Sequence, residues 1–138
     1  MKLFLDTSAF AKRYIAEPDS ATVLELCGGA ERLAVSVICL PEMISTLSRL
    51  VRERRLSAPK YAALKLTVLN DLADTDICEI TDAVMVNAVQ LLETRTLRAM
   101  DAIQVACAIV YQADLFASAD RRQLAAAKRA RLKVADVS

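Results

Sequence analysis

Short apolar runs alternate along this chain with longer stretches in which apolar residues recur every three or four positions. The runs are typical of buried strands, and the longer stretches are typical of amphipathic helices. We expect strands at residues 2–5, 33–37, 76–80, 115–118 and 132–137. We expect helices at about residues 8–16, 19–26, 41–54, 57–72, 81–94, 99–112 and from 120 onward. The only two glycines, Gly28 and Gly29, should end the second helix.

Strands that alternate with helices predict a mostly parallel sheet covered on both faces, that is, an α/β fold. The 138 residues show no repeat or linker, so residues 1–138 are expected to form a single domain. In such sheets, functional sites form outside the carboxyl ends of the strands. Asp6 directly follows the first expected strand and therefore falls in that region.

Composition narrows the class of protein. An apolar fraction of 55% with 25% charged residues favours a globular protein over a disordered one. The net charge of +1 argues against a surface dedicated to non-specific nucleic-acid binding, although a bound metal ion can supply local positive charge. We find no secretory signal or membrane span, so we expect a cytoplasmic protein with no membrane partner. The four cysteines contain no close pair and are expected to be reduced, mostly buried thiols.

Four acidic residues stand at the ends of apolar segments or at the starts of helices, namely Asp6, Glu42, Asp101 and Asp120. Each also has an ordinary structural interpretation. Asp6 and Asp120 can cap helices, Glu42 can favour the start of one, and Asp101 can pair with Arg95 or Arg98. Asp101 fits this interpretation least, because its helix is apolar on nearly every face.

Several carboxylates in one cleft would repel one another by about 1 kcal/mol per pair in water at 4 Å, and by about 4 kcal/mol at an effective dielectric near 20. A bound cation or raised pKa values would make such a cluster tolerable. A site built only of oxygen ligands selects Mg²⁺ or Mn²⁺. The spacing along the sequence does not by itself show that the four acids converge.

Four stretches resemble PIN-domain ribonucleases, and most of all the VapC-type toxins of type II toxin–antitoxin modules. These stretches are MKLFLDTSAFAKRYI at the start, Pro41-Glu42, LRAMDAIQVACA, and SADRRQLAAAKRARL near the end. The resemblance covers nearly the whole chain. Each motif is weak alone, whereas the ordered set is specific.

The resemblance implies a three-layer α/β/α PIN-like fold, a homodimer, and Mg²⁺- or Mn²⁺-dependent cleavage of RNA that a cognate antitoxin protein inhibits. It implies catalytic roles for Asp6, Glu42, Asp101 and Asp120. Asp6, Asp101 and Asp120 would be metal ligands, with Thr7, Ser8 and Ser118 as supporting hydroxyls. The chain departs from the usual pattern at Arg131, where relatives commonly have glycine, and at Gln104, where they often have histidine.

The chain contains no histidine, which excludes a ribonuclease with paired histidines and a Ser-His-Asp hydrolase. Hydrolysis by a metal-activated water fits the residues present and should leave a 5′-phosphate and a 3′-hydroxyl. For RNA contact, Lys12 and Arg13 are the best basic candidates, because their helix leaves the strand that ends at Asp6. The arginines near residues 49–55 and the basic residues 128–133 are interpreted as solvated faces.

Three alternatives stay open. The chain can be a catalytically silent PIN dimer that acts as a binding or regulatory module, or a nuclease directed at DNA. A receiver or phosphatase domain is a third possibility, but no lysine follows a late strand as a receiver requires. The helical pair at about residues 42–72 is expected to supply core, dimer surface and the groove for an antitoxin segment.

Overall fold

Five parallel strands form one central sheet in the computed structural model, which describes all 138 residues. The strand order is β3-β2-β1-β4-β5. The strands are β1 Lys2–Leu5, β2 Arg32–Ser36, β3 Asp76–Cys78, β4 Leu115–Ser118 and β5 Val134–Asp136. Every neighbouring pair is parallel, so the predicted α/β class and the mostly parallel sheet are confirmed.

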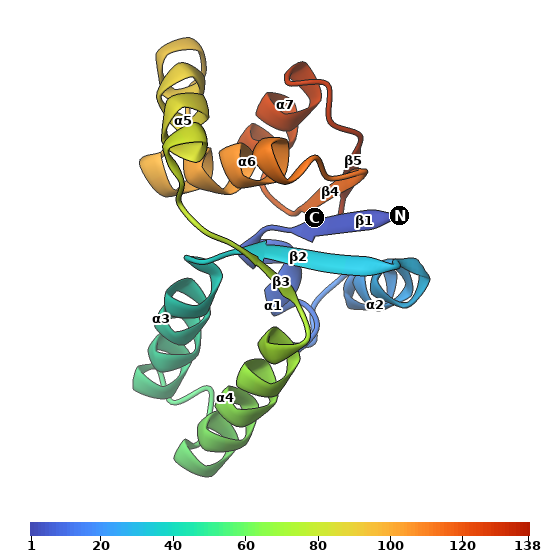
Figure 1. The fold of residues 1–138 in the computed structure, drawn as a ribbon. Helices are drawn as coiled ribbons and strands as arrows, with labels where there is room; N and C mark the ends of the chain where they lie inside the picture. Colours follow the sequence, from blue (N-terminus) through green and yellow to red (C-terminus); the bar gives the residue numbers. More distant parts are fainter.

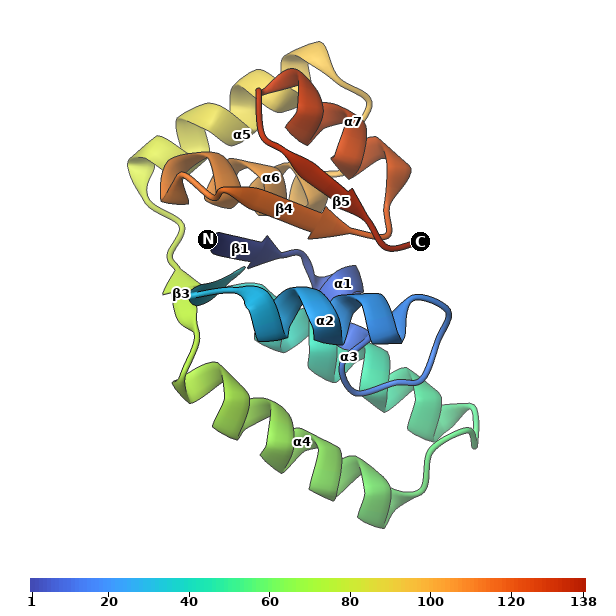
Figure 2. The ribbon, with the colours of Figure 1, turned by 90° about the vertical axis from the view of Figure 1, so that its right-hand side faces the viewer.

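Helices cover both faces of the sheet, which gives the three layers visible in Figure 1 and Figure 2. On one face lie α1 Thr7–Ala11, α2 Ser20–Gly29, α3 Cys39–Arg52 and α4 Ala58–Ala73. On the other face lie α5 Asp82–Thr94, α6 Ala99–Tyr111 and α7 Arg121–Arg129. The long connection from β3 to β4 through α5 and α6 carries the chain across the sheet.

Two apolar cores result from the alternation of side chains along the strands. Phe4 and Phe116 stack at 5.8 Å between ring centroids and belong to the core under α5, α6 and α7. Their neighbours Leu3, Leu5 and Ala117 point to the opposite core, beneath α1–α4. The central strands β1 and β4 are therefore buried on both faces and hold the site that follows them in place.

Several boundaries differ from the sequence prediction. The first helix ends at Ala11 instead of about residue 16, because the next amides bond three residues back, as Arg13 N does to the oxygen of Phe10. The third strand stops at Cys78 instead of residue 80. The α3 helix already begins at Cys39, before Pro41.

The second helix ends at the glycine pair as expected, but it includes both Gly28 and Gly29 instead of ending near residue 26, and neither glycine has a positive φ. Left-handed backbone occurs instead at non-glycine residues that end other helices, including Arg54 with φ 58° and Arg131 with φ 69°. After α7, the amide of Arg131 bonds to Lys128 O and that of Leu132 to Ala127 O, both at 3.0 Å. This is the Schellman arrangement, in which glycine is usual at the position of Arg131.

All four cysteines are free thiols; Cys39 and Cys107 are buried, and Cys27 and Cys78 are half-buried. Burial is the main cause that raises the pKa of the thiols of Cys39 and Cys78 to about 12. The expected reduced thiols are therefore inert as nucleophiles at neutral pH. No helix combines the length and the apolar character that crossing a bilayer requires.

Candidate active site

The site lies at the carboxyl edge of the sheet, where the strand order changes direction. From β1 the chain continues to β2 on one side, while β4 pairs with β1 on the other side. Asp6 follows β1, and Ser118 ends β4. In open parallel sheets, the two strands that flank such a switch point diverge into helices on opposite faces and leave a crevice.

Asp6 occupies the floor of this crevice and is almost fully buried, with 1% of its surface exposed. It is the N-cap of α1, a role that its position in the sequence allowed, and it accepts from the amide of Ala9 at 2.9 Å. The hydroxyls of Ser8 and Ser118 donate to its carboxylate at 2.7 and 2.9 Å. Burial raises the pKa of Asp6 to about 6, the nearby charge of Asp120 adds to this, and the three donors oppose it.

Glu42 stands in the first turn of α3, where a negative charge is favoured. Its Oε1 accepts from Thr7 Oγ1 at 2.6 Å and from the amide nitrogen of Gln104 at 2.8 Å. The same amide nitrogen donates to Thr7 Oγ1 at 2.8 Å, which closes a ring of three side chains. Gln104 is buried, so the hydrogen bonds of this ring hold the carboxylate of Glu42 in place from the interior side of the cleft.

Asp120 and Asp101 are joined through one glutamine. Asp120 caps α7, as predicted, by accepting from the amides of Arg122 and Gln123 at 2.8 and 3.0 Å. The Gln123 side chain does not return to Asp120 as it would in a capping box, because it donates to Asp101 Oδ1 at 2.9 Å. Asp101 forms no ion pair with Arg95 or Arg98, so the ordinary interpretation by a salt bridge is not supported.

All four acids line one cleft of about 560 Å³. Glu42, Asp101 and Asp120 each keep one carboxylate oxygen that makes no hydrogen bond, while the other oxygen is held by protein donors. The remaining lining residues are Thr7, Ser8, Ala11, Glu17, Ser45, Thr46, Arg49, Arg98, Gln104, Ala119 and Gln123. The structure therefore brings the four predicted acids together, and Thr7, Ser8 and Ser118 contact them as expected.

The donor set fits a hard divalent cation. Only oxygens are available, and three of the acids each offer a free one, which suits Mg²⁺ or Mn²⁺. No group of three acidic side chains forms a metal cage by itself. The distances between the carboxylates in the cleft remain compatible with Mg²⁺, because this ion keeps several water ligands and often takes only one or two carboxylates.

Residues that the sequence analysis did not assign to the site also contribute to it. Gln104 was noted only as a departure from the family pattern, and no role in the site was expected for Gln123. On α3, Ser45, Thr46 and Arg49 line the cleft beside Glu42. Their spacing of three, four and seven residues from Glu42 places them on one helix face, a signal that is present in the sequence.

The expectation that Lys12 and Arg13 contact RNA is not supported by their positions. Lys12 is only 6% exposed, and its ammonium group bonds to Glu17 at 3.1 Å and to the oxygen of Pro18 at 2.9 Å. Arg13 pairs with Asp71 at 3.6 Å and lies over the rings of Phe10 and Tyr14. Because α1 is short, the chain turns and directs both cations into the protein instead of toward the cleft.

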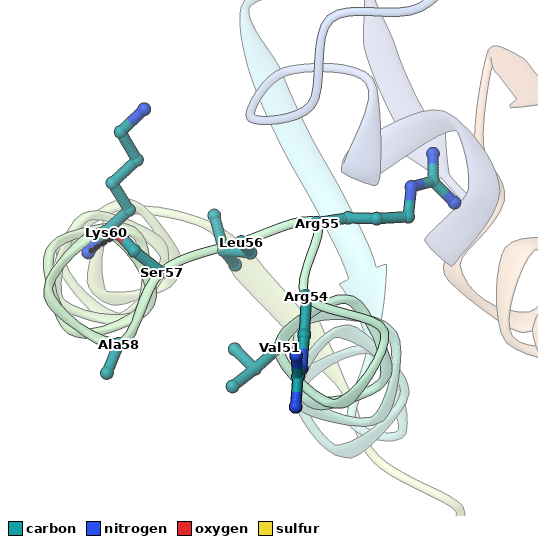
Figure 3. Close-up of a pocket in the computed structure, with 7 residues that line it drawn as sticks. All are labelled: Val51, Arg54, Arg55, Leu56, Ser57, Ala58 and Lys60. Atoms are coloured by element: carbon teal, nitrogen blue, oxygen red, sulfur yellow. Dashed lines mark hydrogen bonds between the residues drawn. The ribbon is translucent and has the colours of Figure 1, made fainter.

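A second hollow of about 450 Å³ lies at the turn between α3 and α4. Figure 3 shows its three cations pointing in different directions, with Lys60 and Arg54 on opposite sides and Arg55 extending toward the α1 region. The cations therefore do not converge on one point. The hollow does not have the geometry of a single anion site.

Comparison with known proteins agrees with this architecture. The PIN-domain family model matches residues 3–129. No curated protein sequence matches the chain. The fold is similar to VapBC2 from Rickettsia felis bound to a promoter DNA fragment, with TM-score 0.71, 17% identity and 100% of both chains covered.

Two further structures show the same likeness. VapBC-1 from nontypeable Haemophilus influenzae gives a TM-score of 0.72 at 14% identity, with 99% of this chain and 98% of that chain covered. VapC20 from Mycobacterium tuberculosis, a toxin that cleaves the sarcin–ricin loop, gives 0.68 at 19% identity, with 90% and 94% covered. A match over residues 3–129 spans nearly the whole chain, and this protein therefore belongs to the PIN-domain family.

Proposed function

We propose that this protein is a metal-dependent endoribonuclease and the toxin of a type II toxin–antitoxin module. The observation that carries the proposal is the gathering of four carboxylates, three with a free oxygen, in one cleft at the switch point of a PIN fold. The likeness to VapC20, a toxin that cleaves an RNA loop, supports RNA as the substrate.

Asp6, Asp101 and Asp120 would hold the metal ion, Mg²⁺ or Mn²⁺, either directly or through its water ligands. When bound, the ion supplies Lewis-acid polarisation of the phosphate and acidifies water. Ser8 and Ser118 hold the carboxylate of Asp6 in one rotamer, and Gln123 does the same for Asp101. Such supporting contacts are commonly worth 10- to 100-fold in metal affinity or activity, by order of magnitude.

Glu42 orients water through its free oxygen, because its other oxygen is fixed by Thr7 and Gln104. With no histidine in the chain, carboxylates are the groups in this cleft that can accept a proton near neutral pH. The 2′-hydroxyl of the RNA therefore has no imidazole base to activate it. We expect attack by water and products with a 5′-phosphate and a 3′-hydroxyl.

The test is cleavage of single-stranded RNA in the presence of Mg²⁺ or Mn²⁺, with end-group analysis of the products. Asp6→Asn, Glu42→Gln, Asp101→Asn and Asp120→Asn should each lose cleavage. Asp74→Asn is the matched control, because Asp74 is exposed at the end of α4 and outside the cleft. Cutting that persists in Asp6→Asn, or a 2′,3′-cyclic phosphate product, would contradict the proposal.

The same assay separates the alternatives. A catalytically silent binding module would cut neither RNA nor DNA, and a DNA-directed nuclease would cut only DNA. Intact acids at all four positions favour activity over a silent module.

The proposed partners are an antitoxin protein and a second copy of the chain. Related folds have been solved as toxin–antitoxin complexes, including one from Klebsiella pneumoniae, with TM-score 0.66 at 16% identity. On α4, Leu66 is 61% exposed and Leu69 is 39% exposed, which suits an apolar antitoxin segment. Co-expression with the product of an adjacent small open reading frame, followed by co-purification and loss of cleavage, tests the antitoxin.

We expected the dimer surface on the α3–α4 pair, but α5 carries the longer exposed apolar face. Met85, Val86, Val89 and Leu92 are 39–57% exposed on that helix. We therefore propose that a homodimer forms through α5. Sedimentation should give a dimer for the wild type and a monomer for Val89→Glu, whereas Gln90→Glu, at an exposed polar position on the same helix, serves as the charge control.

A further inference from the structure

The cleft contains five carboxylates, which presents a problem for an anionic substrate. Asp6, Glu42, Asp101, Asp120 and Glu17 all line it. An RNA backbone entering this cleft is repelled unless cations offset these charges. The two basic residues that the sequence suggested for this purpose, Lys12 and Arg13, are held inside the protein.

Two other cations line the cleft, Arg49 and Arg98. Both are exposed, and the side chain of neither makes a hydrogen bond or an ion pair within the protein. Arg49 stands seven residues after Glu42 on α3, which is about 10 Å farther along the helix axis. This distance keeps its guanidinium available for a ligand instead of neutralising Glu42.

The two arginines come from different layers of the protein. Arg49 belongs to α3, on the face covered by α1–α4, and Arg98 is the N-cap residue of α6, on the face covered by α5–α7. The cleft with its four acids lies at the sheet edge between these layers. A strand of RNA that crosses the cleft from one layer to the other therefore passes a guanidinium group on each side.

The α3 side of this path has further polar groups. Ser45 and Thr46 lie between Glu42 and Arg49 on the same helix face and also line the cleft. Hydroxyl groups and guanidinium groups are the usual partners of phosphate and sugar oxygens. The chain has only six phenylalanine and tyrosine residues, of which none lines the cleft, so stacking on bases has no platform here.

We propose that Arg49 and Arg98 bind the backbone phosphates on either side of the bond to be cut, and so set the register of single-stranded RNA across the acids. This inference rests on the proposed ribonuclease function. It assigns recognition to the backbone at these two positions, so the contacts themselves do not depend on the base sequence.

The test measures binding separately from cleavage. A short fluorescent single-stranded oligoribonucleotide is titrated with Asp6→Asn protein at several KCl concentrations, alone and combined with Arg49→Gln or Arg98→Gln. Each arginine change should weaken binding about fivefold. The affinity falls as salt rises, and each change should reduce the magnitude of the slope of log affinity against log salt concentration by about 0.7. This is the value expected for the loss of one phosphate contact to a single strand. Arg49→Lys should keep most of the affinity, since the charge remains.

Arg52→Gln and Arg95→Gln are the matched controls. Arg52 is an exposed arginine one turn farther along α3, and Arg95 lies at the end of α5; neither lines the cleft. Equal weakening by a control and by Arg49→Gln or Arg98→Gln would overturn the proposal. If the wild type cuts RNA but Arg49→Gln and Arg98→Gln bind it as tightly as the Asp6→Asn parent protein, the proposed phosphate contacts are wrong and the proposed ribonuclease function is retained. If RNA binding depends on both arginines but the wild type cuts no RNA, the proposed ribonuclease function is wrong and the proposed phosphate contacts are retained.

Discussion

The side-chain amide of Gln104 donates to Oε1 of Glu42 at 2.8 Å. The two residues are 62 positions apart in the sequence and lie on different helices, α6 and α3. Histidine, which the family resemblance led us to expect at this position, also presents an N–H donor, so either residue can make the contact that holds Glu42.

Replacing Gln104 by leucine should therefore reduce RNA cleavage by about 10- to 100-fold, the range seen when a supporting hydrogen bond is lost. The variant also removes the amide donor of Thr7 Oγ1 and leaves Glu42 Oε1 with the hydroxyl of Thr7 as its remaining donor. Gln104→His should keep most of the activity, and Gln90→Leu, at an exposed position on α5, should keep all of it. Initial rates of cleavage of the same RNA measure these effects. An unchanged rate for Gln104→Leu would show that the hydrogen bonds around Glu42 do not contribute to catalysis.

Asp6→Asn should change how the stability of the metal-free protein depends on pH. The pKa of Asp6 is about 6 in the folded protein, against 3.8 for the unconstrained group, so the folded state binds the proton more tightly. Stability therefore falls as pH rises from about 4 to about 6, and the whole penalty, about 3 kcal/mol, is present above pH 6. Asparagine carries no charge and avoids this penalty.

Urea unfolding in a chelator at pH 4 and pH 7 measures the effect. Asp6→Asn should be more stable than the wild type at pH 7 and similar to it at pH 4. Added Mg²⁺ should stabilise the wild type more than the variant, because a ligand that binds only the folded state raises its stability. A difference between the two proteins that stays constant across this pH range would refute the raised pKa of the buried Asp6.

Arg131→Gly should stabilise the protein by about 1 kcal/mol. Arg131 has φ 69°, and left-handed backbone costs a residue with a Cβ about 1–2 kcal/mol that glycine does not lose. The greater flexibility of glycine in the unfolded chain offsets part of the gain. Arg129→Gly, two residues earlier within α7, should instead destabilise by about 0.5–1 kcal/mol. Thermal unfolding of both variants shows directly whether each substitution raises or lowers the stability.

Lys12→Gln should lower the melting temperature without weakening RNA binding by the folded protein. The ammonium group is buried and bonds to Glu17 and Pro18, so its removal leaves those acceptors with a poorer partner, at a cost of about 1–3 kcal/mol. Calorimetry gives the stability, and the oligoribonucleotide titration gives the affinity. A stable variant with impaired RNA binding would restore the role that the sequence suggested for Lys12.

The sequence contained enough information for the fold and for the position of the acids, because these depend on local patterns. The run KLFL ended by Asp6 marked the central strand and its site, and Pro41-Glu42 marked the start of α3 to within two residues. The order of the four acids then matched the family. Each of these signals lies within a few neighbouring positions.

The contacts that complete the site depend on distant residues and could not be obtained in this way. A glutamine three residues after Asp120 fits a capping box, and only the packing of α6 against α7 reveals that Gln123 bonds to Asp101 instead. The prediction for Lys12 assumed a helix that continued to residue 16, whereas α1 ends at Ala11. The glycine pair did mark the end of α2, but neither glycine has left-handed backbone, whereas Arg131 accepts that position after α7, where no glycine signals it.

The hydrogen bond from Ser118 to Asp6 spans 112 positions of the chain. During translation, Asp6 leaves the ribosome early, but the strand that supplies Ser118 follows only after most of the remaining residues have been synthesised. A nascent chain shorter than this has neither the neighbour of β1 on that side nor the hydroxyl that steadies Asp6. The arrangement of Asp6 that the proposed activity requires would therefore form only when synthesis is nearly finished.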